Sequence, residues 1–426
     1  MLDLKFVREN PGLVKAGAEK KRIPCDVDRV IELDAVRREV GVRVDDLRSR
    51  QKAAGKSISK ASPEEREGLL AEQKELKDEL KGLEERLSAA QSEMETALLR
   101  IPNVPSEEVP DGADDTDNVE LRKVGEPTRF GFDPFDHVEL GSRHDWLDVE
   151  AGARLAGSRN YVLKGDLALL ENAVMRFALD HMVAKGFTPL SVPVLVRADP
   201  LLGTGFFPGG EDQTYATDER DDLYLVGTSE VPVTSLHAGE ILSLDKLPLR
   251  YVAWTSCFRR EAGTYGKDTR GLYRVHQFQK VEQVVLDVAD EARSVEHHRS
   301  ILGNSEELLQ AFELPYRVVN VCGGDLGSPQ VQKFDIETWM PGRENYGETH
   351  SASRFHDYQA RRLKLRYRDE DKKTRFCHTL NNTVAASTRL LIALLENHQQ
   401  EDGRIGVPPA LRSYLGGRET LGSAVR

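Results

Sequence analysis

The chain has 426 residues with 59 basic and 71 acidic side chains, a net charge of −12, and its length is enough for two or three domains at roughly 150 residues each. A uniformly acidic surface argues against a nucleic-acid partner, because phosphate binding requires clustered Lys and Arg. Four widely separated cysteines exclude a disulfide scaffold, and no apolar run could span a bilayer or resembles a secretory signal, so we expect a cytoplasmic protein with no membrane contact.

Residues 27–100 predict two long antiparallel helices. Apolar residues recur at steps of three and four from Val30 to Ile58 and again from Leu69 to Ala97, which is the heptad pattern of a coiled coil. Between the two runs, Ser62-Pro63-Glu64-Glu65 is typical of a helix start, with a serine cap, a proline in the first turn and acids against the helix dipole. We therefore expect an N-terminal helical domain over 1–100 with a coiled-coil arm over about 30–97.

The two predicted arm helices differ in charge. Residues 37–60 carry eight basic and three acidic side chains, whereas residues 64–100 carry six basic and eleven acidic ones. Either the two helices complement each other in solvent, or the first helix contacts a phosphate backbone. Under the second interpretation, the candidates for nucleic-acid contact are Arg37, Arg38, Arg43, Arg48, Arg50, Lys52 and Lys56.

Residues 101–120 interrupt the helical pattern. They hold seven acidic and no basic side chains, more than half of the net charge, together with Pro102, Pro105, Pro110 and Gly112. This composition predicts a linker, to which we assign residues 101–135, ahead of a second domain over 136–426. The net charge of the whole chain therefore describes an average and does not exclude a polyanion partner.

The second domain mixes strands and helices without a strict alternation. Strands are predicted at 188–196, 223–226, 251–258, 277–286 and 316–321, and helices at 166–185, 288–311 and 383–399. His297 and His298 fall on a predicted helix and are expected at its surface. Clustered strands of this kind favour an α+β domain built on an antiparallel sheet.

The segment from Phe258 to Phe278 carries the strongest chemical pattern. One strand presents Arg259 and Glu261 on the same face, and after a glycine-containing loop a second strand presents Arg274 and Phe278 on one face. Arginines clamp phosphates, a carboxylate can accept a base amino group, and an aromatic ring can stack on a purine. The hairpin therefore predicts a nucleotide site, although the chain has no P-loop and no Rossmann fingerprint.

Three segments together resemble the class II aminoacyl-tRNA synthetases. Residues 186–193, 258–278 and 380–389 resemble motifs 1, 2 and 3 of that class. Within the class, the chain resembles the seryl-tRNA synthetases at 1–11, 227–232, 276–282, 324–327 and 357–363, and in its long N-terminal hairpin. The resemblance covers essentially the whole chain in order.

The resemblance implies a serine–tRNA ligase. Such an enzyme activates L-serine with ATP and Mg²⁺ and transfers it to the 3′ end of tRNA-Ser, and of tRNA-Sec where present. It implies a homodimer with Pro193 at the interface, and an arm that contacts the long variable arm of the tRNA. The absence of a cysteine cluster, together with Thr228-Ser229-Glu230, implies that no zinc is used.

The resemblance also assigns site residues. Those implied for serine are Thr228, Ser229, Glu230, Arg259, Glu282 and Thr383. Those implied for ATP are Arg259, Arg260, Glu261, Arg274, Val275, Phe278, Glu348, Thr349, His350, Ser351 and Arg389. Magnesium is assigned to Glu348 and Ser351.

Two stretches depart from the common bacterial pattern. His350, Ala352 and Arg354 are unusual in a segment that commonly runs E-x-S-S-C-S-N, and Asn382-Thr383 resembles the eukaryotic-type form of motif 3. Two alternatives therefore stay open: a paralogue that charges an acceptor other than tRNA, and an inactive coiled-coil interaction protein. Loss of the arm would favour the first and loss of Arg259, Glu261 or Arg389 the second, but all are present.

Overall fold

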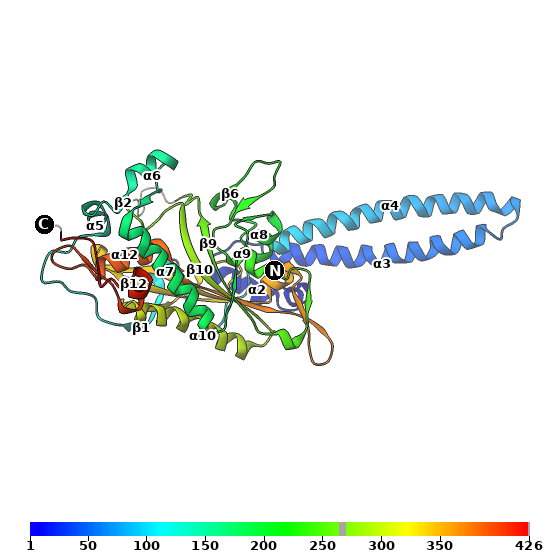
Figure 1. Cartoon of the computed structure of the whole chain (residues 1–426). Helices are drawn as coiled ribbons and strands as arrows, with labels where there is room; N and C mark the ends of the chain where they lie inside the picture. Colours follow the sequence, from blue (N-terminus) through cyan, green and yellow to red (C-terminus); the bar gives the residue numbers. More distant parts are fainter. Residues whose placement is uncertain (264–269, 425–426) are drawn as a thin grey trace. The chain divides into compact units, whose positions relative to one another are not determined.

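The computed structural model describes residues 1–263 and 270–424, and part of the predicted motif 2 loop lies outside them. The chain divides into two compact units (Figure 1). The first comprises Met1–Glu19 and Ile23–Pro102, and the second comprises Lys20–Arg22 and Asn103–Arg426. No helix among the described residues is long and apolar enough to cross a membrane.

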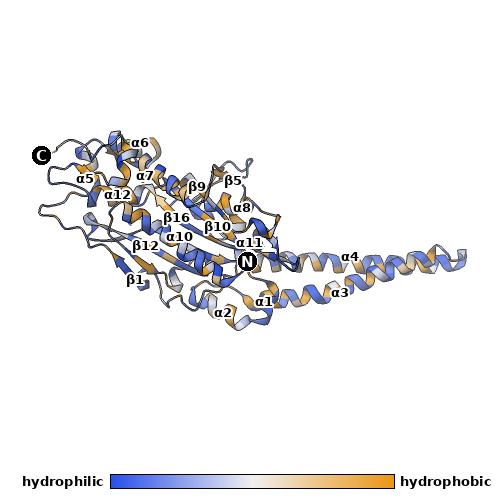
Figure 2. Ribbon diagram, turned by 60° about the horizontal axis from the view of Figure 1, so that its bottom comes forward, coloured by the Kyte–Doolittle hydropathy of each residue, from blue (hydrophilic) through white to orange (hydrophobic). Residues whose placement is uncertain are grey.

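The first unit is helical, with α1 (Leu4–Glu9), α2 (Pro11–Lys20), α3 (Val27–Ile58) and α4 (Pro63–Leu99). α3 and α4 run side by side in opposite directions and bury a seam that includes Val40, Val44, Leu47, Leu76 and Leu80. Hydrophobic and hydrophilic residues alternate along both helices, as the heptad pattern predicts (Figure 2). α4 begins as predicted, with Ser62 and Glu65 in a reciprocal capping box and Pro63 as its first residue. The predicted long helical hairpin is confirmed.

A buried carboxylate anchors the start of α3. The side chain of Asp34 is 1% exposed and accepts hydrogen bonds from Arg8 at 2.9 Å, Arg37 at 2.8 Å and Arg38 at 3.0 Å. Burial alone would raise the pKa of Asp34, but the three guanidinium groups outweigh it and lower the pKa. Arg8 belongs to α1, so this cluster ties α1 to α3.

The second unit is built on an eight-stranded sheet in the order β1-β11-β12-β13-β16-β10-β9-β4. Its strands are β1 (Val119–Val124), β4 (Thr188–Leu190), β9 (Leu249–Phe258), β10 (Gln277–Asp287), β11 (Tyr316–Asn320), β12 (Gln332–Met340), β13 (Asn345–His356) and β16 (His378–Ala386). All neighbours are antiparallel except β4 and β9. The predicted α+β class with an antiparallel sheet is confirmed.

Three helices supply most of the core beside the sheet. α7 (Gly165–Ala184), α10 (Glu291–Ala311) and α12 (Ser387–Asn397) pack apolar side chains against the central strands. Shorter elements complete the unit: α5 (His137–Arg143), β2 (Leu147–Asp148), α6 (Val149–Ala156), β3 (Val162–Leu163), β5 (Leu195–Val196), α8 (Ala198–Thr204), β6 (Tyr215–Ala216), β7 (Tyr224–Leu225), α9 (Glu230–Thr234), β8 (Ile241–Leu242), α11 (Tyr358–Leu363), β14 (Arg366–Arg368), β15 (Thr374–Phe376), β17 (Ile405–Gly406), α13 (Pro409–Arg412) and β18 (Thr420–Leu421).

Lys21 belongs to the second unit although it lies early in the chain. Its side chain is buried, and its ammonium donates to the backbone oxygens of Gly327 at 3.1 Å, Ser328 at 3.0 Å and Gln330 at 2.5 Å. Burial lowers the pKa of this ammonium well below its usual value. Three carbonyl oxygens around one cation resemble the coordination of a bound ion, and they hold the loop before β12 in one conformation.

Several details of the second unit differ from the sequence predictions. The strand predicted at 188–196 divides into β4 and β5, which belong to different sheets. The predicted linker contains β1, whose residues are almost all exposed, so no buried face gave the strand a hydrophobic period. Residues 383–386 belong to β16, and the helix predicted from 383 begins only at Ser387. His297 and His298 are buried, because His297 bonds to Asp287 at 2.8 Å and His298 to the backbone oxygen of Ala352 at 2.9 Å.

Candidate active site

The predicted nucleotide hairpin is formed by β9 and β10. Phe258 lies opposite Gln277, and the backbone N–H of Arg259 donates to the oxygen of His276 at 2.9 Å. This register places the Arg259 guanidinium 5.2 Å from the centre of the Phe278 ring. A cation over the ring face is stabilised by the quadrupole of the ring. Arg259 and Phe278 therefore form one wall before any ligand is bound.

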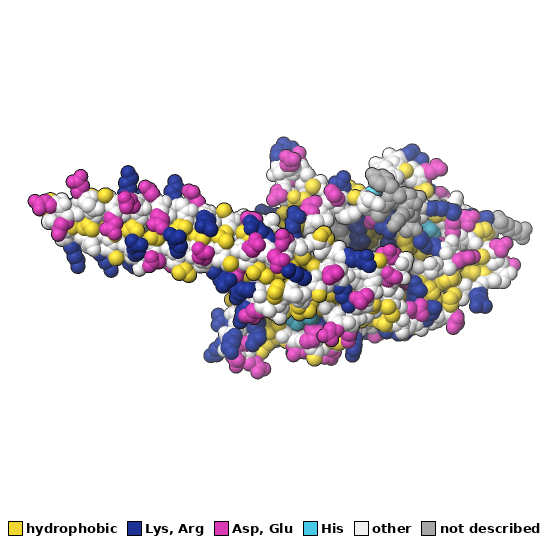
Figure 3. All heavy atoms as spheres, turned by 180° about the vertical axis from the view of Figure 1, so that it is seen from behind, with side chains coloured by type: hydrophobic (Ala, Val, Ile, Leu, Met, Phe, Trp, Pro, Cys, Tyr) yellow, Lys and Arg dark blue, Asp and Glu magenta, His cyan; other side chains and the backbone are white. Residues whose placement is uncertain are grey.

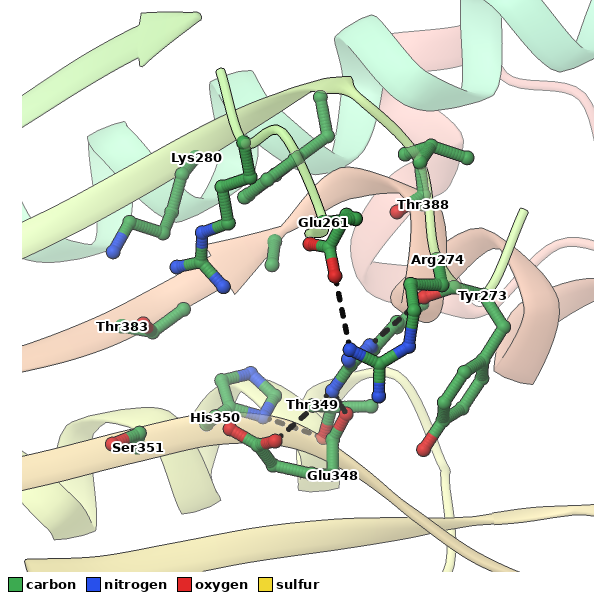
Figure 4. Close-up of a pocket in the computed structure, with 15 residues that line it drawn as sticks. Glu261, Tyr273, Arg274, Lys280, Glu348, Thr349, His350, Ser351, Thr383 and Thr388 are labelled. Atoms are coloured by element: carbon green, nitrogen blue, oxygen red, sulfur yellow. Dashed lines mark hydrogen bonds and ion pairs between the residues drawn. The ribbon is translucent and has the colours of Figure 1, made fainter. Parts of the chain in front are cut away.

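A hollow of about 510 Å³, open to solvent, lies beside this wall (Figure 4). Its lining includes these predicted residues: Arg259, Glu261, Arg274, Val275, Phe278, Glu348, Thr349, His350, Ser351, Thr383 and Arg389. Arg260 is exposed, does not line the hollow, and donates its backbone N–H to Gln213 at 3.0 Å. Adjacent residues of an extended chain face opposite sides, which explains why Arg259 and Arg260 separate.

Glu261 and Arg274 form an ion pair across the mouth of the hairpin. Arg274 Nη1 lies 3.0 Å from Glu261 Oε2, and Figure 4 shows the two side chains pointing toward each other. The backbone of Glu261 is left-handed, with φ of 51°, a conformation that costs a non-glycine residue about 1 kcal/mol or more. Strained residues of this kind cluster at ligand sites, and here the strain turns the carboxylate into the hollow.

Arg389 and Glu348 meet on the other side of the hollow. Arg389 Nη1 donates to the backbone oxygen of Glu348 at 2.6 Å and to Glu348 Oε2 at 3.1 Å. Arg389 lies in the first turn of α12, directly after β16, and Glu348 comes from β13, so the strand pairing brings them together. Partial burial would raise the pKa of Glu348, but Arg389, Lys333 and Arg259 outweigh it and hold the pKa at about 2.

The pair Glu348 and Ser351 fits a magnesium ion by its chemistry. Mg²⁺ is usually held by one or two carboxylates together with substrate phosphates. Glu348 is ionised at neutral pH, its side chain is 47% exposed, and Ser351 adds a hydroxyl to the same lining. Within residues 1–263 and 270–424, no three His, Cys, Asp or Glu side chains form a ready ion site. Phosphate oxygens of a nucleotide would therefore have to complete the coordination.

Buried polar groups lie behind the hollow. The Lys280 ammonium is 2.5 Å from Glu282 Oε2, and Thr383 Oγ1 donates to the same oxygen at 3.2 Å. Glu282 and Thr383 are direct partners in the β10–β16 ladder, just after a bulge at Val281. The side chains of Lys280 and Glu282 are 6% and 3% exposed, so their pairing compensates two charges that are almost out of reach of water.

Glu230 is a second buried carboxylate, at the start of α9. Gln359 Nε2 donates to Glu230 Oε1 at 2.8 Å, and the backbone N–H of Glu230 donates to Thr228 Oγ1 at 3.2 Å. Burial, with Glu282 nearby, raises the pKa of Glu230 to about 7. Ser229 is fully buried, and among the described residues its hydroxyl has no hydrogen-bond partner.

Several residues of the site were not predicted from the sequence, among them Lys280, Gln359 and Tyr273. Lys280 alternates with Glu282 on one strand, a spacing that could have revealed their pairing. Gln359 lies in a segment already matched to the family, but its contact with Glu230 is a tertiary one. Tyr273 accepts a hydrogen bond from Arg389 Nε on its backbone oxygen at 3.2 Å and lines the hollow.

The unusual residues of β13 separate into two groups. His350 lines the hollow, where burial lowers its pKa to about 4 and keeps the ring neutral at pH 7. Its Nδ1 lies 2.8 Å from Thr349 Oγ1. Ala352 is buried outside the lining, and Arg354 is buried against Glu291 and Gln332. Of the three departures, only His350 can touch a ligand in this hollow.

The basic residues of α3 also fall into two groups. Arg37 and Arg38 pair with Asp34, and across the hairpin Arg43 pairs with Glu79 at 2.9 Å and Arg48 with Glu84 at 2.7 Å. In the part of the chain that the structure describes, the exposed side chains without a carboxylate partner include Arg50, Lys52 and Lys56. Figure 3 shows charges of both signs interspersed along the arm. The complementary-helix interpretation therefore holds for Arg43 and Arg48, whereas Arg37 and Arg38 pair within α3. Arg50, Lys52 and Lys56 stay candidates for phosphate contact.

The antiparallel sheet with this hairpin and its two arginine–carboxylate pairs defines a class II aminoacyl-tRNA synthetase. Residues 214–398 match the model of the tRNA synthetase class II core domain (G, H, P, S and T). Residues 1–105 match the model of the seryl-tRNA synthetase N-terminal domain. Together with the full-length relatives below, these matches show that the chain belongs to the seryl-tRNA synthetase family.

Its relatives cover the whole chain. The serine–tRNA ligase of Deinococcus radiodurans is 51% identical over 426 residues, all of both chains. The crystal structure of the seryl-tRNA synthetase from Pyrococcus horikoshii complexed with ATP has a TM-score of 0.93 at 39% identity, over all of both chains. That of the cytoplasmic serine–tRNA ligase from Naegleria fowleri in complex with AMP has a TM-score of 0.88 at 32% identity, over 99% of each. The predicted enzyme class, an aminoacyl-tRNA ligase, is confirmed, and the two alternative functions are not favoured.

Proposed function

We propose that the protein activates L-serine with ATP to seryl-adenylate and pyrophosphate, and then transfers the seryl group to the 3′ end of tRNA-Ser, or of tRNA-Sec where present. The observation that carries this proposal is the hollow itself. Arg259 over Phe278 and the Arg274–Glu261 pair lie within one lining with Arg389 and Glu348, directly in front of the buried Glu282.

The first step requires positioning and charge neutralisation, with no protein nucleophile. The serine carboxylate attacks the α-phosphate in line and pyrophosphate leaves. Arg259 would contact both the carboxylate and the α-phosphate. Phe278 would stack on the adenine above Val275, and Glu261 would accept from its amino group. Preorganised cations of this kind lower the barrier because they need no reorganisation during the reaction.

Arg274 and Arg389 would hold the outer phosphates, each exchanging its present carboxylate for phosphate oxygens. Magnesium, held by Glu348 and Ser351 together with the nucleotide, would supply further neutralisation of the phosphate charge. Glu348 suits this role because its low pKa keeps it ionised. Thr349 and His350 complete this side of the lining, and the neutral His350 ring adds no charge.

The buried polar groups fit a hydroxyl substrate. We assign Thr228, Ser229, Glu230, Glu282 and Thr383, with Arg259, to serine binding. A buried acceptor left without its partner is costly, so a site of this kind can reject an analogue that lacks the hydroxyl by roughly 10⁴–10⁵. Alanine would leave such an acceptor unpaired, which is the physical basis of the proposed preference for serine.

For the arm, we propose contact with the long variable arm of tRNA-Ser. Exposed cations at the distal end of α3, namely Arg50, Lys52 and Lys56, support this assignment. Deleting residues 37–94 should abolish charging of tRNA and leave serine-dependent pyrophosphate exchange nearly intact. Charging that survives the deletion would contradict this role of the arm.

We further propose a cytoplasmic homodimer with the domain division predicted above: 1–100, 101–135 and 136–426. Pro193 is exposed between β4, at the edge of the large sheet, and β5, and the neighbouring Leu195 is 42% exposed. An exposed apolar edge of this kind suits burial against a second copy. Light scattering on the purified protein should give twice the mass of the chain, and Pro193→Asp should shift it toward one copy.

The decisive test is ATP–pyrophosphate exchange with serine, threonine, alanine or cysteine as the amino acid. Exchange should depend on serine and be weaker by orders of magnitude with alanine. A second assay should follow the transfer of labelled serine to tRNA. No serine-dependent exchange by the folded protein would overturn the proposed function.

A further inference from the structure

Two arginines stack on the ring of Tyr273. The Arg389 guanidinium is 4.5 Å from the ring centre, and the Arg343 guanidinium is 4.0 Å from it. The two guanidinium carbons therefore lie no farther apart than the sum of these distances, about 8.5 Å. Arg389 and Tyr273 both line the hollow, and Tyr273 is labelled at its rim in Figure 4. Arg343 is distant in sequence, but because it stacks on Tyr273 it lies next to the candidate ATP site.

Gly347 makes room for this arrangement. A Cβ atom at Gly347 would lie 3.0 Å from two atoms of Tyr273, its Cε2 and its hydroxyl oxygen, and 3.0 Å from Met340 Sδ. Contacts this short force a neighbour to move. The place that a side chain before Glu348 would occupy is thus taken by the tyrosine ring, and Arg343 lies against that ring.

The turn that carries Arg343 is anchored to the core. It is the 3-10 turn Pro341–Arg343, between β12 and β13. The backbone N–H of Gly342 donates to Glu396 Oε2 at 2.8 Å. At the end of the turn, the backbone N–H of Glu344 donates to the backbone oxygen of Pro341 at 3.0 Å. Pro341 is buried, whereas Arg343 itself is exposed. The backbone that carries Arg343 is therefore held against the core.

The charges of the hollow explain why another cation would be useful. Three of its four cations lie against a carboxylate: Arg274 against Glu261, Arg389 against Glu348, and Lys280 against Glu282. A triphosphate therefore meets little net positive charge. Stacking on an aromatic ring occupies the face of a guanidinium and leaves the N–H donors at its edge, which are the groups that bind phosphate.

We infer that Arg343 is an additional phosphate-binding residue, which holds the outer phosphates of ATP and the pyrophosphate product from its position beside Tyr273. This inference rests on the proposed function, because it assumes that the nucleotide lies in the hollow with its outer phosphates toward Arg389. Tyr273 is a positioning residue that stacks both arginines, and Gly347 permits its placement.

The test compares Arg343→Ala and Arg343→Lys with a matched control. Arg143→Ala removes an arginine stacked at the same distance, 4.0 Å, on Phe135 and outside the hollow. Equilibrium binding of ATP and AMP is measured for each protein, together with the KM for pyrophosphate and for serine in the exchange reaction. AMP is the diagnostic ligand, because it has adenine, ribose and the α-phosphate without the outer phosphates.

In Arg343→Ala, the Kd for ATP and the KM for pyrophosphate should rise about tenfold, while the Kd for AMP and the KM for serine stay within about twofold. Lysine should restore part of the loss, and Tyr273→Leu should weaken ATP more than AMP. Unchanged ATP and pyrophosphate values would overturn the inference, as would equal weakening of AMP and ATP. Because ATP and AMP binding needs no serine, this result is independent of whether the wild-type protein shows serine-dependent exchange.

Discussion

The arm and the catalytic pocket both depend on arginine–carboxylate pairs, but in different surroundings. Arg43 and Glu79 on the arm are 59% and 47% exposed, whereas Arg274 and Glu261 are 26% and 12% exposed. Exposed pairs contribute about 0–1 kcal/mol each because water screens them. Breaking a buried pair leaves a charge without compensation and costs about 3–5 kcal/mol. Single changes should therefore have large effects in the pocket and graded, salt-dependent effects on the arm.

The largest effect is expected at Arg259. Arg259→Ala should lower the rate of serine-dependent pyrophosphate exchange by about 10²–10³, the usual cost of removing one preorganised group that stabilises developing charge. Arg260→Ala, at the neighbouring exposed residue, should lower it less than about tenfold, because Arg260 lies outside the hollow. Equal losses in the two variants would show that the hollow does not define the site.

The next effect concerns the pH dependence of stability at Glu230. Its pKa is raised from 4.5 to about 7 by burial and by Glu282, so the folded protein keeps a proton that the unfolded chain has already lost. The free energy of unfolding should therefore fall as the pH rises from about 5 to 8, by up to about 3 kcal/mol from this group.

Glu230→Gln should remove this part of the pH dependence and impair serine activation. The measurement is the melting temperature of both proteins at pH 5 and pH 8. The wild type should lose more stability across this range than the variant. If the melting temperatures of both proteins change equally between pH 5 and pH 8, the ionisation of Glu230 does not lower the stability of the folded protein.

A smaller effect is expected in the first unit at Asp34. Asp34→Ala removes a buried acceptor shared by Arg8, Arg37 and Arg38, and should lower the free energy of unfolding by about 1–3 kcal/mol. Glu79→Ala removes only an exposed pair and should cost less than about 1 kcal/mol. Thermal melts followed by helical circular dichroism separate the two variants, and a cost at Glu79 as large as at Asp34 would contradict the comparison.

The smallest single effects belong to the distal end of α3. Replacing Arg50, Lys52 or Lys56 by alanine should weaken tRNA binding severalfold each and reduce its salt dependence by about 0.7–0.9 in the log–log slope per lost phosphate contact. Arg43→Ala and Arg48→Ala should change this slope less, because each arginine already faces a glutamate. Binding titrations at several salt concentrations test the difference, and equal slopes for all five variants would remove the distinction.

The arm was predictable because its information is local. Heptad spacing and the Ser62–Glu65 cap determine two helices with little help from the rest of the chain. The strand that carries Phe278 was predicted for a similar reason, since alternation over a strand indicates which side chains share a face. The prediction that one strand presents Arg259 and Glu261 was wrong, because β9 ends at Phe258 and Glu261 has a left-handed backbone.

What the sequence could not supply is contact between distant segments. β1 is an exposed edge strand without a hydrophobic period, and its pairing with β11 spans about 200 residues of chain. The Gln359–Glu230 bond and the stack of Arg343 on Tyr273 likewise join separate elements. Arg260 shows a different case, because its motif position suggested a ligand contact, whereas the residue is exposed and outside the lining of the hollow.

The buried ammonium of Lys21 has a consequence for how the protein can be cut. A fragment that starts at Asn103 would contain the whole sheet but would lose this cation, and three carbonyl oxygens at Gly327, Ser328 and Gln330 would lose their shared donor. The boundary between the two units in space therefore does not follow a single cut in the chain. A minimal catalytic fragment would need residues 20–22 restored, either as a fused segment or as an added peptide.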